Sequence, residues 1–421
     1  MIGQRCKGTR DLLPPDMRRF RHIEEVFRAS CQGWGYEEVR TPVLEYLHLF
    51  TAAGTLTPSM LSRVYSFLDW DGWSGERVVL RPDGTIPAAR LFLNEMEGKK
   101  TARMFYVENV FSFEETGTQA RERWQCGVEL LGGSSPMAEV ELILLALEIL
   151  RGMGLEGVGV CLAHTGFLRA LLGALDLGVE EQEGLLDQIL DGNARALEAI
   201  KPADAELQRA ISLLFELKGD SPAFLKNLRA LLVPHHPGLA SSLDDFLQVA
   251  ELLTGLGCGY RIDMTSGKGF EYYTGAVFQF YAGDEKVGAG GRYDHLVPLL
   301  GGEDLPASGL ALYMEPLMRL TAPPAPSMQD RRVLVVVGTG GELSSGFGVM
   351  RSLREAGFNV ELDLGRGETS AYRWRLLVPG GKGAPLVLTE SGAKKGLECS
   401  SAAEVLRALE ETPGEDPRRR P

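Results

Sequence analysis

The sequence predicts an α+β protein in which an antiparallel sheet with flanking helices is interrupted by a helical insertion and followed by a small α/β module. Strand-like segments lie between 77 and 133 and return after 258, whereas residues 165–257 are leucine-rich with almost no strand pattern. Three prolines within four positions, in TAPPAPSMQD at 321–330, indicate an extended linker. The expected parts are a discontinuous core at 1–164 and 258–322, the insertion at 165–257, a reduced α/β domain at 331–411 and a disordered tail at 412–421.

The elements of the core follow from hydrophobic periodicity. Pro15–Cys31 has helical spacing that places Phe20, Ile23 and Phe27 on one face. The segments ERVVLR, RMFYVENVFSF and RWQCGVELLG are typical of strands, and Ser135–Gly154 is typical of a long helix. After the insertion, strand patterns recur in GYRIDM, EYYTGAVFQFYA and SGLALYM.

The segment after the linker predicts three strands and two helices. The strands are expected at Val333–Val337, Val360–Leu364 and Leu386–Leu388, and the helices at Ser345–Ala356 and Ala402–Leu409.

Composition excludes several classes of protein. Apolar residues make up 44% and charged residues 24% of the 421 residues, which is ordinary for a globular chain and excludes a disordered or collagen-like one. No apolar run reaches the roughly 18 residues of a membrane span, and the polar start Met1–Asp11 has no signal core, so we expect a cytoplasmic protein without membrane contact. A formal charge of −13 disfavours binding nucleic acid by charge alone.

The sequence predicts neither a metal site nor a cofactor. The six cysteines are far apart, form no C-x-x-C pair and have no histidine at ligand spacing, so they are expected to be small buried side chains. The glycine run Gly338–Gly341 lacks the third glycine of a dinucleotide fingerprint, because Leu343 stands there.

The segment Arg81-Pro82-Asp83-Gly84-Thr85 follows a predicted strand. Its proline and glycine favour a turn that presents Asp83 and Thr85 side by side. A carboxylate and a hydroxyl in this arrangement could receive an ammonium group. The alternative is a capped turn that opens the next helix.

Two polar residues of RWQCGVELLG are four positions apart. In a strand, Gln125 and Glu129 share one face, and Gly127 lies between them and clears space above the sheet. This pattern predicts a pocket floor, and a solvent-exposed face is an equal alternative.

A third candidate region contains a cation and two tyrosines. Lys268, Tyr272 and Tyr273 lie in KGFEYYTG, and the glycine-rich segment GAGGRYD follows at 288–294. Glycines permit close approach of a ligand or of a neighbouring strand, whereas tyrosine pairs are usually core or interface residues. Each of these segments alone is weak evidence for a binding site.

Together, these segments resemble the signature segments of histidyl-tRNA synthetases, a class II aminoacyl-tRNA synthetase family. The match runs over about residues 3–320 and consists of GTRDLLP, TPVLE, RPDGT, RWQCGVELLG, GFEYYTG, GGRYD and GLALYMEPL. The resemblance implies a class II synthetase-like fold. It also implies a homodimer that associates through the motif 1 region near Pro42–Glu45.

The chain departs from that family where ATP is held. The resemblance implies arginines in motifs 2 and 3, but Ser112 and Pro316 stand there, and Lys268 matches the family's own catalytic arginine. A guanidinium offers phosphate a charged planar fork, serine offers one neutral donor and proline offers none. Each loss should cost on the order of 100- to 1000-fold in rate, so we expect negligible adenylate formation.

The amino-acid pocket of the family is largely retained. The positions that match its histidine-binding residues are Asp83, Thr85, Gln125, Glu129, Tyr272 and Tyr273, and Lys268 joins them as a further candidate. Asp83 is one methylene shorter than the glutamate usual there. A pocket that holds histidine without activating it suits a sensor.

This profile resembles the regulatory subunits of short-form ATP phosphoribosyltransferase. The resemblance implies a non-catalytic chain that activates a separate catalytic subunit at the first step of histidine biosynthesis and takes part in feedback inhibition by histidine. It implies no catalytic residues in this chain and no tRNA partner. Residues 331–411 depart from that family, because they look like a reduced anticodon-binding domain.

Two alternatives remain open. A divergent but active histidyl-tRNA synthetase is favoured by residues 331–411 and opposed by Ser112 and Pro316. A synthetase-like module that binds tRNA or another enzyme, without a link to histidine synthesis, is the other.

Overall fold

We describe the protein from a computed structural model. The description covers residues 3–53, 63–70, 75–96, 98–114, 116, 118–134, 136–175, 177–190, 207–209, 211, 219–264, 273–322, 331–338, 343–365, 372–380, 384–393 and 395–411. The chain divides into two compact units, Met1–Pro323 and Pro324–Pro421. The expected linker residues 323–330 and the expected tail 412–421 lie outside the described residues.

The elements of the first unit alternate between strands and helices along the chain. In order they are α1 (Pro14–Gly33), β1 (Glu37–Glu38), β2 (Leu44–Tyr46), α2 (Leu47–Ala52), β3 (Ser66–Trp70), β4 (Gly75–Leu80), α4 (Thr85–Glu95), β5 (Ala102–Phe111), β6 (Glu122–Leu131), α5 (Met137–Gly152), β7 (Gly159–His164), α6 (Thr165–Gly173), α7 (Val179–Leu190), α10 (Pro222–Leu232), a 3-10 turn (Pro237–Leu239), α11 (Ala240–Gly255), β8 (Arg261–Ile262), β9 (Ala276–Ala282), β10 (Glu285–Arg292), α12 (Leu296–Leu299), β11 (Ala307–Tyr313) and α13 (Met314–Leu320).

An eight-stranded sheet forms the centre of this unit, with the order β1-β5-β6-β11-β10-β9-β7-β8. The six central strands are antiparallel neighbours, as expected. The outer strands β1 and β8 each pair in parallel with their neighbours, which the sequence analysis did not predict. The GYRIDM segment contributes only the two residues of β8, because pairing with β7 is confined to Cys161–Arg261 and Leu162–Ile262.

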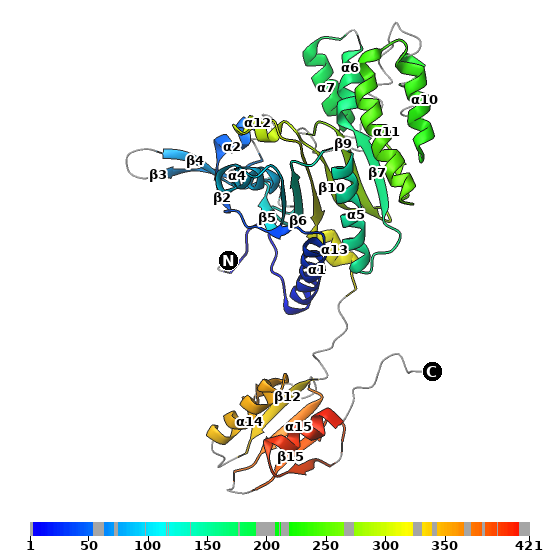
Figure 1. Ribbon diagram of the computed structural model, residues 1–421. Helices are drawn as coiled ribbons and strands as arrows, with labels where there is room; N and C mark the ends of the chain where they lie inside the picture. The colour runs from blue at the N-terminus through cyan, green and yellow to red at the C-terminus, as the bar shows by residue number, and fades with distance from the viewer. Residues whose placement is uncertain are drawn as a thin grey trace. The chain divides into compact units, whose positions relative to one another are not determined.

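Helices α1, α5 and α13 cover one face of this sheet (Figure 1). The hydrophobic periodicity of α1 explains how it packs on the sheet. The ring centres of Phe20 and Trp124 of β6 lie 5.1 Å apart in an edge-on contact, and those of Phe27 and Phe105 of β5 lie 5.7 Å apart. Asp16 caps the first turn of α1 by accepting the Leu13 N–H at 3.2 Å. On the opposite face, α4 packs against β6.

The described parts of the insertion contain helices α6, α7, α10 and α11, which gather at one end of the unit (Figure 1). Gly219 forms an isolated bridge to Ile262 of β8. A separate three-stranded sheet, with the order β2-β4-β3, lies in the N-terminal part of the chain.

The second unit is an α/β domain with its own core. Its elements are β12 (Arg332–Val337), α14 (Leu343–Glu355), β13 (Asn359–Leu362), β14 (Trp374–Val378), β15 (Leu386–Glu390), β16 (Leu397–Cys399) and α15 (Ala402–Glu411). The sheet has five strands in the order β13-β12-β14-β15-β16, so the expectation of three strands was wrong. Strand β14 was not predicted, although Trp374, Leu376 and Val378 are buried on one face, and β16 is too short to show a pattern.

Candidate functional site

The face of the sheet opposite α1 and α5 carries a buried polar network centred on β6. Tyr106 of β5 lies directly across from Gly127 of β6. Its hydroxyl accepts from Gln125 Nε2 at 3.3 Å and donates to Glu129 Oε1 at 3.0 Å. Gln125 and Glu129 therefore share one face of β6 and are bridged by the same phenol.

The space above Gly127 is filled, which corrects the expectation of an open gap. A Cβ built on Gly127 would lie 2.0 Å from the Tyr106 ring. The absent side chain thus makes room for the ring of a neighbouring strand. Tyr106 was not among the predicted site residues, because its place opposite Gly127 depends on the register between β5 and β6.

Glu129 is the best-connected carboxylate of this network. It accepts from the Thr85 hydroxyl at 2.8 Å and from the hydroxyls of Tyr106 and Tyr293. A Cβ on Gly309 of β11 would fall 2.0 Å from Glu129 Oε2, so the carboxylate occupies space that a glycine leaves. Tyr293 belongs to the GGRYD segment, but the sequence analysis did not assign it to the site.

Burial controls the charge of Glu129, which is 1% exposed. Desolvation raises the pKa of Glu129 to about 8, the nearby charge of Asp83 adds to this increase, and the hydroxyl donors oppose it. At neutral pH the carboxyl group therefore holds a proton in a large share of molecules. A ligand that donates hydrogen bonds or carries positive charge would favour the ionised form.

Asp83 both caps a helix and borders the network. Its Oδ1 accepts the Ile86 N–H at 2.8 Å at the start of α4, which supports the capped-turn alternative. Burial raises the pKa of Asp83, while the N–H groups of Ile86, Thr85 and Gly84 lower it in part. Because Thr85 donates to Glu129, the turn brings two carboxyl groups and a hydroxyl together at one end of the site.

The turn is held in place by a buried ion pair. Arg81 Nη1 lies 2.6 Å from Glu108 Oε2, and both side chains are at most 3% exposed. Arg81 also donates to the carbonyls of Thr41 and Asn109 at 2.9 and 2.8 Å. This guanidinium therefore ties the residues that precede Asp83 to Glu108 and Asn109 of β5.

Tyr273 packs beside the network. Its ring centre lies 6.4 Å from that of Tyr293, and a Cβ on Gly291 would be 2.8 Å from the Tyr273 ring. The two other residues proposed for this side of the pocket, Lys268 and Tyr272, lie outside the described residues.

The two positions at which ATP-binding arginines were expected to be lost are Ser112, after β5, and Pro316, in α13. Ser112 follows β5, and its N–H donates to the Arg121 carbonyl at 3.0 Å. Pro316 is the third residue of α13, where a missing N–H costs no helical hydrogen bond. Neither residue offers a cationic donor.

Two arginines lie near Ser112. Arg121 Nε donates to the Glu114 carbonyl at 2.7 Å, and its guanidinium sits 5.0 Å from the Phe113 ring centre. Arg123 is on the site face of β6, and its charge acts on Tyr313 of β11, whose pKa is raised by burial to about 12 and lowered in part by that charge. The guanidinium of Arg121 is thus directed at its own loop.

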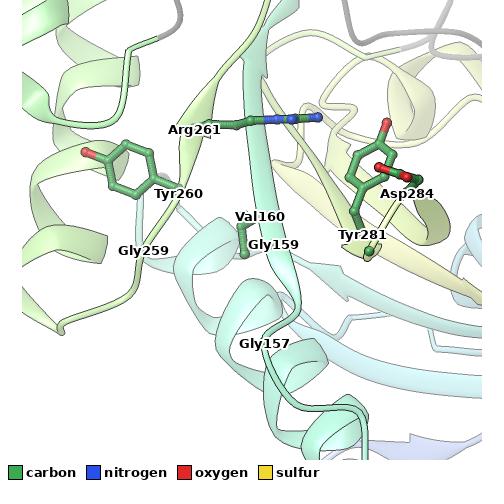
Figure 2. A pocket seen from close by; sticks show the side chains of 9 residues that line it. Gly157, Gly159, Val160, Gly259, Tyr260, Arg261, Tyr281 and Asp284 are labelled. Carbon is green, nitrogen blue, oxygen red and sulfur yellow. The ribbon is translucent and has the colours of Figure 1, made fainter.

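A separate recess of about 420 Å³ lies at the β8 edge of the sheet. It opens where β7 and β8 part, between Gly159 and Gly259. Figure 2 shows Arg261 reaching toward Tyr281 and Asp284, and the guanidinium lies 5.4 Å from the Tyr281 ring centre. None of the residues that line it belongs to the site predicted from the sequence.

Metal and membrane sites were also sought over the described ranges. Those residues contain no group of three or more His, Cys, Asp or Glu side chains that could hold a metal ion. They also contain no helix with the length and apolar character that crossing a membrane requires.

Comparison with known proteins shows which class of protein this chain belongs to. The family model of histidyl-tRNA synthetase matches residues 8–317. The histidine–tRNA ligase of Archaeoglobus fulgidus is 33% identical over 369 residues, which is 86% of each chain. The fold and the sequence together define a class II synthetase-like protein of the histidyl type, as predicted.

Three curated proteins of Dehalococcoides mccartyi, each named ATP phosphoribosyltransferase regulatory subunit, are more similar. Each is 49% identical over 375 residues, covering 89% of this chain and 91% of the relative. The chain belongs to the family of ATP phosphoribosyltransferase regulatory subunits.

Solved structures support the fold. A Bacillus halodurans protein described as an ATP phosphoribosyltransferase regulatory subunit/histidyl-tRNA synthetase superposes with a TM-score of 0.77 at 23% identity, covering 90% of this chain and 99% of that one. Histidyl-tRNA synthetase from Nostoc sp. superposes with a TM-score of 0.74 at 19% identity, covering 98% and 99%. At these identities the likeness is one of fold.

Proposed function

We propose that this chain is a non-catalytic regulatory subunit that activates a short-form ATP phosphoribosyltransferase catalytic subunit and relays inhibition by histidine. The observation that carries the proposal is the 49% identity to regulatory subunits over 89% of the chain. The reaction is the transfer of a phosphoribosyl group to ATP at the first step of histidine biosynthesis. The proposed setting is the cytoplasm.

Ser112 and Pro316 support the absence of adenylation. A phosphate held by two arginines gains charge-assisted hydrogen bonds worth roughly 1.5–3 kcal/mol each. The Ser112 and Pro316 side chains supply none of that charge. The Arg121 guanidinium donates to the Glu114 carbonyl.

We propose that histidine binds at the buried polar network of Asp83, Thr85, Gln125, Glu129 and Tyr273. Lys268 and Tyr272 stay candidates from the sequence, and Tyr106 and Tyr293 are added from the structure. Two carboxyl groups beside three hydroxyls suit the ammonium and the imidazole N–H of histidine. Both carboxyl groups are buried, and the low dielectric constant around them strengthens these bonds.

We also propose a homodimer that associates through the three-stranded sheet. Leu44, Tyr46 and Phe67 lie on one face around Val78 and are 50%, 48% and 46% exposed. This cluster adjoins the Pro42–Glu45 region that resembles motif 1. A contiguous exposed apolar cluster of this kind is typical of an interface.

A lysine at Phe67 tests the dimer. Phe67→Lys should weaken self-association at least roughly tenfold, because a charge would be buried in an apolar contact. Leu252→Lys is the control, since Leu252 is 40% exposed on α11. Analytical ultracentrifugation measures both, and equal dimerisation of the two variants would contradict the proposed surface.

The function itself is tested by reconstitution. Adding this chain to a short-form catalytic subunit should increase phosphoribosyl transfer at least about tenfold, and histidine should reverse the increase. The chain alone should show no histidine-dependent ATP–pyrophosphate exchange. An unchanged transfer rate would count against the regulatory role.

An active histidyl-tRNA synthetase is the competing function, favoured by the 33% identity to the Archaeoglobus ligase. It predicts exchange at rates typical of synthetases and charging of tRNA with a steep salt dependence. Either result would replace the proposal.

A further inference from the structure

We propose that the buried ion pair between Arg292 and Glu139 positions Tyr293, and through it Glu129, on the opposite face of the sheet. Arg292 ends β10 and Tyr293 follows it, so their side chains leave the backbone on opposite sides. The Arg292 side chain reaches Glu139 of α5, whereas the Tyr293 hydroxyl donates to Glu129. Only the ligand measurement below depends on the proposed histidine site.

The ion pair is enclosed by protein. Glu139 is fully buried and Arg292 is 8% exposed. Arg292 Nε donates to Glu139 Oε1, and Nη1 donates to Asp294 Oδ2 at 3.4 Å. A Cβ on Gly275 would lie 2.7 Å from Arg292 Cδ, so a glycine on the next segment makes room for the side chain. The guanidinium therefore lies between Glu139 of α5 and Asp294.

The backbone on both sides of Tyr293 is tied to the same structure. The Thr274 N–H donates to the Arg292 carbonyl at 2.8 Å, and the Tyr293 N–H donates to the Ala307 carbonyl at 2.7 Å. Asp294 Oδ1 accepts the Ala307 N–H at 3.0 Å. Rotation of the Arg292 backbone would therefore move the Tyr293 hydroxyl away from Glu129.

Stability alone does not account for this pair. Among the described residues, Glu139 Oε2, Arg292 Nη2 and Ser308 Oγ are buried and have no hydrogen-bond partner. Ser308 lies directly across from Arg292 in the β10–β11 register, so the three groups share one region beneath the sheet. A buried ion pair with unmatched polar atoms is generally no more stable than an apolar replacement of similar volume. Fixing the geometry of the site is the role that remains.

The same helix provides a matched control. Glu141 of α5 pairs with Arg103 of β5 at 3.0 Å, and both side chains are partly exposed. This pair also joins α5 to the sheet, but neither of its residues adjoins Tyr293. Glu141→Gln therefore removes a helix–sheet ion pair without touching the proposed connection.

The decisive variant replaces both charges by apolar side chains, as Glu139→Leu with Arg292→Met. We expect its thermal midpoint to equal or exceed that of the wild type. The titration midpoint of Glu129, followed by NMR of carboxyl-labelled glutamate, should rise by about half a unit or more, because the Tyr293 donor is weakened. Histidine affinity should fall roughly fivefold. Glu141→Gln should change neither the titration nor the affinity.

An unchanged Glu129 titration in the double variant would overturn the proposal. If the wild type binds no histidine, the proposed function fails, but the titration still decides the role of the pair. If the double variant does not fold, Arg292→Lys keeps a charge and loses the planar fork. It should then raise the Glu129 midpoint as well, and a midpoint equal to that of the wild type would contradict the inference.

Discussion

Replacing Glu129 by glutamine is expected to make the first unit more stable at pH 8 and to leave it almost unchanged at pH 5. Burial raises the pKa of Glu129 from 4.5 to about 8 in the folded protein. Between these values the unfolded chain releases a proton that the folded chain retains, so wild-type stability falls as pH rises. The neutral amide of glutamine removes this loss, which is on the order of 3–5 kcal/mol at pH 8.

Thermal unfolding of the full chain between pH 5 and 8.5 measures this difference. Glu141→Gln should change stability in the opposite direction. Partial burial raises the pKa of Glu141, but hydrogen bonds from Arg103 and Tyr36 outweigh it and lower that pKa. That variant should lose stability at pH 8. Parallel pH profiles of wild type and Glu129→Gln would contradict the raised pKa.

The same variant should also affect the ligand. A cationic or donor group of histidine favours the ionised Glu129, so wild-type affinity should rise with pH up to about 8 and then level off. In Glu129→Gln this rise should be much smaller, and affinity at pH 8 should fall about 10- to 100-fold. Calorimetric titration at several pH values measures both.

Replacing Arg81 by methionine is expected to cause the largest loss of stability that we predict for one side chain. The change leaves Glu108, which is 2% exposed, as a buried charge without its ion-pair partner. It also removes donors from the carbonyls of Thr41 and Asn109. Breaking a buried pair in this way costs about 3–5 kcal/mol.

Arg103→Met is the matched control, because Arg103 is 42% exposed and its pair with Glu141 is at the surface. It should cost no more than about 1 kcal/mol. The double variant Arg81→Met with Glu108→Leu should regain part of the loss, since the uncompensated charge is gone. Denaturant unfolding measures all three, and equal costs for Arg81→Met and Arg103→Met would refute the prediction.

The path from Arg81 to the site explains why this residue matters for function as well. Its N–H donates to the Val43 carbonyl and its carbonyl accepts from Phe111, both at 3.0 Å. Asp83 follows two residues later and borders the polar network around Glu129. Arg81→Met is therefore expected to weaken any ligand held by Asp83, even under conditions where the variant is folded.

The sequence by itself determined the elements that depend on local pattern. The apolar stripe of α1 and the alternation along β6 each specify a local conformation. The motif segments also sufficed to predict a class II synthetase-like fold and the family of regulatory subunits. From the sequence, Thr85 and Glu129 were predicted only to belong to the same site. The hydrogen bond between them was not predicted.

The tertiary structure alone decided which groups complete the site. Tyr106 fills the space above Gly127, Tyr293 reaches Glu129 across 164 positions, and Arg292 meets Glu139 across 153. These contacts depend on the register between strands that are distant in the chain, and a shift of one residue would turn each side chain to the other face. Local periodicity contains no information about that register, so the partners of Glu129 and its raised pKa follow only from the assembled sheet.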